Sequence, residues 1–284
     1  MRTSIRATVL LSMLACSGIA WSMPSSYPLT QCASKTSDVD LRECVAKQAQ
    51  QDQKLFEAST SLAKSKLAGW VADDDRKKES SAAYDAALAA FKEFRRQQCE
   101  AYASTAGNAD ASAHDSLQKS CEGAMDATFA EQETTALANL PQRGSWLGHA
   151  GSLVDYAQPI LDGDAFPDCA TQANNKMHPD IVLMNCFEGK ADDSAKTVKP
   201  AIITLLKTMQ NWNQSADIKD LSSALYKVAK PAFDRFSVKQ ALFIGSLVVD
   251  DADKGRAMAS MASQISWNSF YVDRLTDATK RVSK

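Results

Sequence analysis

Seven cysteines constrain the fold of this 284-residue chain more than any other feature of its sequence. One of them falls in a stretch with the pattern of a removable leader, and six remain after it. An even number of cysteines is typical of a disulfide framework when the chain lies outside the cytoplasm. The remaining six are Cys32, Cys44, Cys99, Cys121, Cys169 and Cys186.

Residues 1–22 predict a signal peptide. Arg2 and Arg6 precede a short apolar stretch, and small residues around Trp21 fit the site at which such a leader is cleaved. The stretch is too short for a membrane span, which needs about 20 apolar residues. We therefore expect a mature chain that begins at Met23, is exported to the periplasm and has no membrane span.

An alternative makes Cys16 the attachment point of a lipid anchor. The preceding residues, Met13 to Ala15, fit that signal poorly, because a small residue is expected at the second position. The periplasmic reading without an anchor is the better supported of the two.

The charge of the chain is uneven. Residues 23–143 hold 14 Lys and Arg against 18 Asp and Glu, whereas residues 144–284 hold equal numbers of the two signs. Nucleic-acid binding needs a basic face, so this distribution argues against a nucleic-acid partner. It is compatible with a cationic protein partner and also with ordinary solvated acidic helices.

Helical periodicity runs along the whole chain, and no sustained alternation predicts a strand. The sequence predicts an all-α fold with two domains, residues 23–143 and 144–284, separated near Pro141 to Gly144. In the first domain we expect an antiparallel hairpin of helices over residues 39–70 and 76–103, followed by a third helix over residues 112–137. Asp73, Asp74 and Asp75 lie between the first two helices and can cap the second.

Each hairpin helix carries one charge in the middle of its apolar stripe, Asp52 in the first and Arg95 in the second. A level antiparallel pairing about a turn near residues 73 and 74 would bring them together. An isolated buried charge is costly, whereas a hydrogen-bonded pair is tolerated and can fix the register of two helices. We predict a structural ion pair between Asp52 and Arg95; an acid–base dyad is the weaker reading, because arginine is not a useful proton shuttle.

Four cysteines of the first domain allow three pairings, and the sequence does not choose firmly among them. Cys44 and Cys99 lie near the same end of the expected hairpin, which favours their pairing and leaves Cys32 for Cys121. In the second domain, Cys169 and Cys186 with His178 lack a fourth ligand for zinc. We expect a disulfide there and no metal or other cofactor.

Residues 32–137 combine an early cysteine pair, an aspartate and a leucine further along, an aromatic-x3-Arg-x3-Cys signature and a fourth cysteine. These features fall on Cys32, Cys44, Asp52, Leu55, Phe91, Arg95, Cys99 and Cys121. In this combination, residues 32–137 resemble the LprI-like lysozyme inhibitor family. The chain departs from the family pattern at four positions, Phe56, Phe91, Arg96 and Phe129, where the family usually has Asn, Trp, Asp and Arg.

The resemblance implies a small exported helical domain and a protein partner, a cell-wall muramidase. Binding and inhibition of such an enzyme is the first functional expectation, with an immunity protein against a delivered peptidoglycan-degrading toxin as a close variant. An adaptor that does not inhibit anything is the alternative. Candidate contact residues are Asp73, Asp74 and Asp75 together with Ser104 and Asn108 of the following loop.

The second domain has no comparable resemblance. Apolar stripes predict further helices, and Pro200 and Pro231 sit where first-turn prolines belong. Three histidines are scattered, and no phosphate loop or catalytic signature is found, so we expect a protein that is not an enzyme. An acidic run at residues 250–253 lacks the glycine and closing glutamate of a calcium loop.

Overall fold

The computed structural model describes residues 31–138, 140, 169, 172, 179–248 and 253–283. The predicted leader, Cys16, the expected domain boundary near Pro141 and the acidic run at residues 250–253, apart from its last residue, lie outside these residues. All the regular structure described is helical, as predicted, and no strand occurs in it. Within the same part of the chain, no helix has the length and apolar character needed to cross a membrane.

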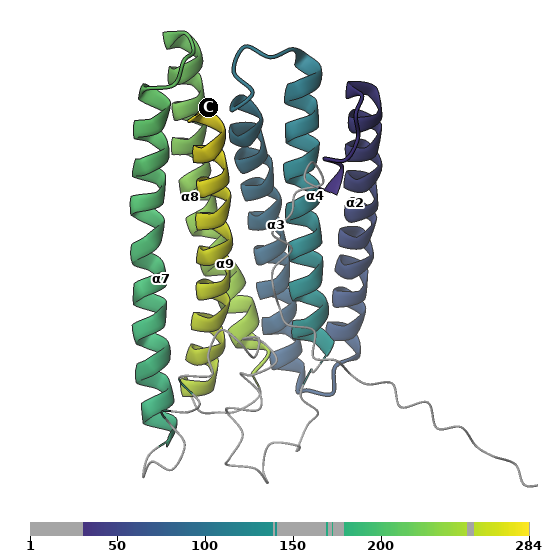
Figure 1. The fold of residues 1–284 in the computed structure, drawn as a ribbon. Coiled ribbons are helices and arrows are strands. Elements are labelled where there is room, and N and C mark those ends of the chain that lie inside the picture. The colour runs from purple at the N-terminus through teal and green to yellow at the C-terminus, as the bar shows by residue number, and fades with distance from the viewer. Residues whose placement is uncertain are drawn as a thin grey trace, which may run out of the picture.

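Six long helices make up the described fold (Figure 1). In chain order they are α2 (Asp38–Gly69), α3 (Asp74–Ser104), α4 (Ala111–Ala138), α7 (Pro179–Gln210), α8 (Ala216–Ser246) and α9 (Asp253–Val282).

Side chains cap the starts of two of these helices, and the cap at Asp73 is the one that the sequence predicts. The Ser37 hydroxyl accepts a hydrogen bond from the backbone of Asp40, and the Asp73 carboxylate accepts one from the backbone of Arg76. Each satisfies one of the N–H groups that a helix start leaves open.

Pro200 and Pro231 do not begin helices, which corrects the prediction. Both lie inside continuous helices, α7 and α8. Their rings are on the solvent side, where a lost backbone hydrogen bond can be replaced by water. The expected breaks at these prolines are therefore absent from the two helices.

The expected hairpin of α2 on α3 is also wrong in its packing. A short turn joins the two helices, but α2 packs mainly against α4, and α3 packs mainly against α8. The helices stand side by side in Figure 1, with α7 at one edge and α2 at the other. Helix α3 thus lies in the middle of the molecule and not on the outer face of a hairpin.

The two halves of the chain are repeats of one three-helix unit. Tyr84 and Tyr226 are 142 residues apart, and the same offset relates the starts of α2, α3 and α4, to within one residue, to those of α7, α8 and α9. The packing repeats as well: α7 lies on α9 as α2 lies on α4, and α8 lies on α9 as α3 lies on α4. Identical residues at this offset include Cys44 and Cys186, Trp70 and Trp212, Ser80 and Ser222, Phe91 and Phe233, Phe94 and Phe236, Gln98 and Gln240, and Ser104 and Ser246.

The repeats meet through α3 and α8 in a reciprocal manner. Phe91 of the first repeat contacts Phe236 of the second at 5.4 Å between ring centroids, and Phe94 contacts Phe233 at 5.3 Å. Phe94 and Phe236 stack on each other at the centre. Contacts in which residue i meets j and j meets i are the mark of a twofold relation.

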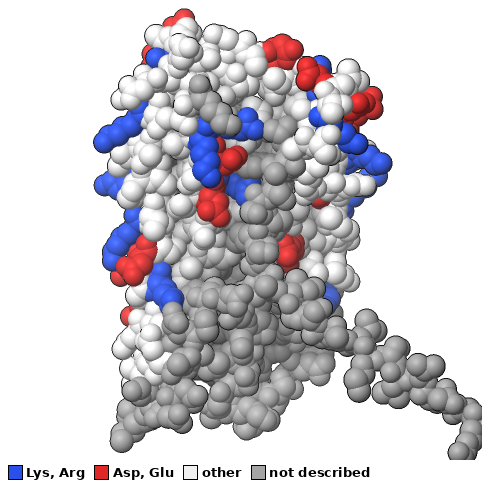
Figure 2. Space-filling view, in the orientation of Figure 1, with Lys and Arg blue, Asp and Glu red and all other residues white. Residues whose placement is uncertain are grey.

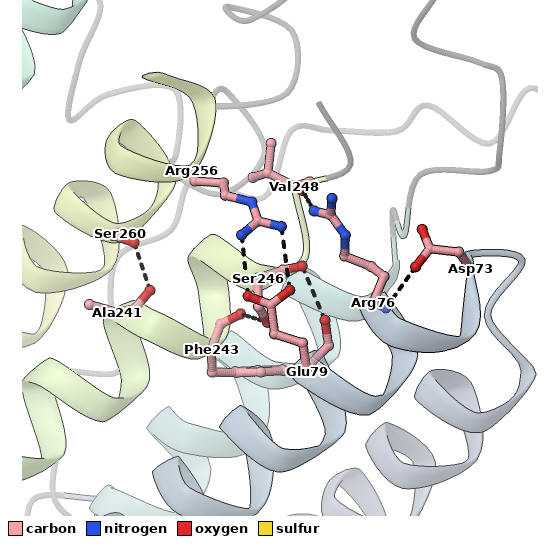
Figure 3. A network of polar contacts seen from close by, with 10 residues as sticks. Asp73, Arg76, Glu79, Ala241, Phe243, Ser246, Val248, Arg256 and Ser260 are labelled. Carbon is pink, nitrogen blue, oxygen red and sulfur yellow. Dashed lines mark hydrogen bonds and ion pairs between the residues drawn. The ribbon is translucent and has the colours of Figure 1, made fainter. Parts of the chain in front are cut away.

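One continuous hydrophobic cluster includes residues of both repeats, from Phe56 in α2 to Val282 at the end of α9. Two polar contacts add to it at one end of the molecule (Figure 3): Arg76 donates to the backbone carbonyl of Val248 at 2.6 Å, and Arg256 pairs with Glu79 at 3.2 Å. The described residues of the two repeats therefore share one hydrophobic core.

Candidate functional site

Arg95 of α3 makes its ion pair with α4 and not with α2. Its Nη2 atom lies 2.7 Å from Oδ2 of Asp126 and 3.7 Å from Oε2 of Glu122. Asp52 instead accepts a hydrogen bond from the Gln48 side chain one turn earlier in α2. The predicted Asp52–Arg95 pair is thus wrong, because α2 packs against α4 and the carboxylates of α4, Asp126 and Glu122, take up Arg95.

Burial dominates the electrostatics of this cluster. It raises the pKa of Asp126 to about 7, against the lowering effect of the Arg95 guanidinium. Burial also raises the pKa of Asp52, which the hydrogen bond from Gln48 partly opposes. The carboxylates are held inside the helix bundle and not at the wall of a cleft.

The second repeat shows what this cluster does. At the positions equivalent to Arg95 and Asp126 it has Ser237 and Asn268, so both charges are replaced together. The same three-helix unit folds without them. The Arg95–Asp126 pair is therefore a structural link between α3 and α4. Arg95 was predicted to make a structural ion pair, but with Asp52 and not with Asp126.

The two disulfides of the first repeat differ from the predicted ones, and each joins cysteines that are consecutive in the sequence. Cys32 bonds to Cys44, with 5.9 Å between their Cα atoms, and Cys99 bonds to Cys121, with 5.3 Å. The favoured pairing of Cys44 with Cys99 is wrong, because Cys99 on α3 faces α4.

The disulfide between Cys169 and Cys186 is confirmed, with 5.6 Å between Cα atoms. It repeats the Cys32–Cys44 link, since each joins a residue ahead of the unit's first helix to that helix near its start. His178 lies outside the described residues, and no group of three or more metal-ligating side chains occurs within them.

The predicted contact residues lie at opposite ends of α3. Asp73 to Asp75 are exposed at its start, where Asp73 caps the helix and Asp74 lies 3.8 Å from Lys77. Ser104 and Asn108 lie at its end, about 45 Å away at 1.5 Å per residue. They cannot form one compact contact surface.

Ser104 is a packing residue. It is buried, its hydroxyl donates to the carbonyl of Ala101, and its own carbonyl accepts from Ser222. Asn108 is exposed, and its backbone N–H donates to the side chain of Gln214. Of the two, only Asn108 is accessible to a partner.

Three of the four departures from the family pattern contact one another. The rings of Phe91 and Phe129 stack at 4.1 Å, and Phe56 lies 5.5 Å from each of them. Phe56, Phe91 and Phe129 thus form one aromatic cluster between α2, α3 and α4. The fourth departure, Arg96, is at the surface and pairs with Glu93 and Glu100.

A cavity of about 460 Å³ opens at the end of the molecule where the Cys32–Cys44 disulfide lies. It is bounded by the start of α2, the loop between α3 and α4, the start of α4 and the last turn of α9. Its charges are mixed, since Arg42 and Arg281 face it together with Asp38 and Asp110. The hydroxyl of Ser112 and the backbone N–H of Ala113 hold the pKa of Asp110 below its usual value.

A second, more apolar groove of about 620 Å³ runs along the outer surface between α2 and α4. Leu55 and Leu62 line it and are largely exposed, and alanines and threonines of α4 form the opposite wall. This groove was not predicted from the sequence. Its signal is a pair of leucines seven residues apart on the face of α2 away from the buried stripe.

Glu133 was also missed. It is fully buried in α4 and accepts a hydrogen bond of 2.9 Å from Gln240 of α8, across the two repeats. Burial raises the pKa of this carboxyl to about 8, against the effect of the Gln240 hydrogen bond. The group is therefore held protonated at neutral pH within the core.

Comparison with protein families, with curated proteins and with solved structures finds no match to this chain. Charges of both signs are mixed on the surface. On the face shown in Figure 2, basic and acidic side chains are interspersed, and neither sign covers a continuous area.

Proposed function

We propose that the chain is an exported protein that binds and inhibits a cell-wall muramidase, either a lysozyme or a peptidoglycan-degrading toxin. The resemblance over residues 32–137 motivates this function, and three disulfides support export, because such bonds persist outside the cytoplasm. The periplasm is the compartment that the leader at residues 1–22 favours.

The observation that carries the proposal is the turn between α2 and α3. It presents three consecutive carboxylates at one end of the molecule, and the Asp74 side chain is completely exposed. Lysozyme-like enzymes commonly have cationic surfaces, so a local acidic tip would speed the encounter with them. Asp74 and Asp75 would make the contact, while Asp73 caps the helix behind them.

A second candidate function is an adaptor that does not inhibit an enzyme. The outer groove between α2 and α4 favours it, because exposed leucines opposite small residues suit the apolar face of a partner helix. In this case the acidic turn would play no part in binding.

A cell-wall turbidity assay with the purified, disulfide-bonded protein tests the inhibitor. We expect lysis by at least one of several lysozymes to be slowed at micromolar concentration, and Asp74→Asn with Asp75→Asn to weaken the effect about tenfold. The matched control is Asp192→Asn with Asp193→Asn, which removes the same charge from exposed positions of α7. Inhibition that is absent for every muramidase tried, or equal in both variants, would contradict the proposal.

A further inference from the structure

The solvent face of α8 carries an apolar seam with the spacing of a coiled coil. Its seven positions alternate three and four residues apart, and all seven are exposed. Six of the seven are apolar, and the four large ones are more than half exposed. The seam consists of Leu221, Ala224, Val228, Pro231, Arg235, Val238 and Leu242.

The fold does not require this seam, and the first repeat shows why. Helix α3 has the same place in its own repeat, and five of its seven equivalent positions are exposed, while Ala86 and Glu93 are half-buried. Four of its seven equivalent positions are charged, and the other three are alanines. The equivalent residues are Glu79, Ala82, Ala86, Ala89, Glu93, Arg96 and Glu100.

Several of these exposed positions are charged in α3, so the fold does not need apolar residues there. Large apolar side chains at the same positions of α8 indicate a contact with another molecule. Apolar residues at alternating spacings of three and four are what a helix needs to pack lengthwise on another helix. The occupant is therefore a helix that lies along α8.

The charges beside the seam identify that helix. Asp220, Lys227 and Asp234 follow one edge at intervals of seven residues, so their signs alternate. Asp234 also binds Lys230 within α8, at 2.6 Å. An alternating edge is complementary to itself when two copies run in opposite directions, because Lys227 of each copy then lies beside Asp234 of the other.

We propose that the seam docks a second copy of this chain, with the two α8 helices antiparallel. In the register that sets Lys227 beside Asp234, Leu221 packs opposite the second copy's Val238, and small Ala224 lies opposite long Arg235. The same register places Arg235 close to the second copy's Asp220. Val228 then lies opposite Pro231, and Leu242, at the end of the seam, lies opposite Asp217 in the first turn of the second copy's α8. The one long cation in the seam, Arg235, meets a small residue and has Asp220 close to it.

Sedimentation equilibrium of the purified, disulfide-bonded protein from about 1 to about 100 µM tests the dimer. We expect a mass twice that of one chain, and Leu221→Glu with Val238→Glu to raise the dissociation constant by about 100-fold or more. The equivalent positions of α3 hold charged residues, Glu79 and Arg96, so the variant is expected to keep its helical circular dichroism spectrum. The matched control, Leu55→Glu with Leu62→Glu in the outer groove, places the same charges on other exposed apolar positions and is expected to remain dimeric.

A charge exchange tests the antiparallel register. Asp234→Lys alone is expected to weaken the dimer about tenfold, and addition of Lys227→Asp to restore it. A monomer at the highest concentration would overturn the proposal and leave the seam to a different protein. A dimer that survives the α8 variant, or that only the groove variant dissociates, would overturn it as well, and failure of the exchange to restore dimerisation would refute the register.

Discussion

Ser80 and Ser222 are equivalent residues of the two repeats, and each donates its hydroxyl across the interface to the other repeat. Ser80 donates to the backbone carbonyl of Ser246 at 3.1 Å, and Ser222 to that of Ser104 at 3.4 Å. The acceptors are themselves equivalent, and each lies at the last residue of a central helix, where carbonyls lack helical partners. Two equivalent hydrogen bonds thus connect the two repeats, one at each end of the α3–α8 interface.

The serine pair predicts an additive loss of stability. Ser80→Ala is expected to lower the free energy of unfolding by about 1 kcal/mol, since it leaves the Ser246 carbonyl without its side-chain donor. Ser222→Ala is expected to lower it by about 0.5 kcal/mol, since the Ser104 carbonyl keeps the backbone N–H of Gly107 at 3.1 Å. The sites are at opposite ends of α3, so the double variant should lose the sum. Urea denaturation measures all three, with exposed Ser61→Ala of α2 as the neutral control. A double variant no less stable than either single one would show that the two contacts are not independent.

The ion pair of Arg95 with Asp126 predicts that removing one partner costs more than removing both. Arg95→Ser leaves the Asp126 carboxylate, which is buried, without its cation and is expected to cost about 3 kcal/mol. Arg95→Ser with Asp126→Asn installs the residues of the second repeat and is expected to cost about 1 kcal/mol.

Thermal and urea unfolding of Arg95→Ser, of Asp126→Asn and of the double variant at neutral pH give the coupling free energy between the two residues. The control is Arg96→Ser, which removes the neighbouring exposed arginine and should change stability by less than about 0.5 kcal/mol. Costs that simply add in the double variant would contradict a direct pair.

The Cys99–Cys121 disulfide predicts a tolerated loss. The second repeat has Ala241 and Ser263 at these positions, so Cys99→Ala with Cys121→Ser is expected to fold while losing about 3 kcal/mol of stability. Mass spectrometry of peptides from the unreduced wild type should show Cys32 linked to Cys44 and Cys99 linked to Cys121. A peptide that joins Cys44 to Cys99 would contradict this connectivity.

Local signals in the sequence predicted local structure well. The all-α fold, the cap at Asp73 and the Cys169–Cys186 link each follow from residues that are close in sequence or from periodicity alone. The partner of Arg95 could not be predicted in this way, because it depends on α2 packing on α4, which no spacing within α2 and α3 reveals.

The internal repeat was predictable and was missed. A comparison of the sequence with itself, offset by the distance from Tyr84 to Tyr226, would have shown it. This comparison would have predicted that α3 and α8 are equivalent helices. It would also have distinguished core residues that both repeats share from core residues that occur in only one repeat. Glu133 belongs to the second class, since Leu275 holds the equivalent position, and its burial follows only from the packing of α4 beside α8.

Glu133 predicts a stability that falls as pH rises. In the unfolded chain this carboxyl titrates near its ordinary pKa of 4.5, whereas in the folded chain its pKa is raised to about 8. Between these values the folded chain holds a proton that the unfolded chain has lost, so the free energy of unfolding decreases with increasing pH in this window. Asp126, with its pKa raised to about 7, adds to the same slope.

Glu133→Gln removes this titration and keeps a side chain that can hydrogen-bond to Gln240. The variant is expected to be about 2 to 4 kcal/mol more stable than the wild type at pH 8. Near pH 4 the two should differ by less than about 0.5 kcal/mol, because wild-type Glu133 is then protonated in the folded chain and mostly protonated in the unfolded chain. Urea denaturation between about pH 4 and pH 9 measures the difference. The control, Glu57→Gln at an exposed position of α2, should follow the wild-type curve. A wild-type curve parallel to that of Glu133→Gln throughout this range would mean that Glu133 is ionised in the folded chain, against the effect of its burial.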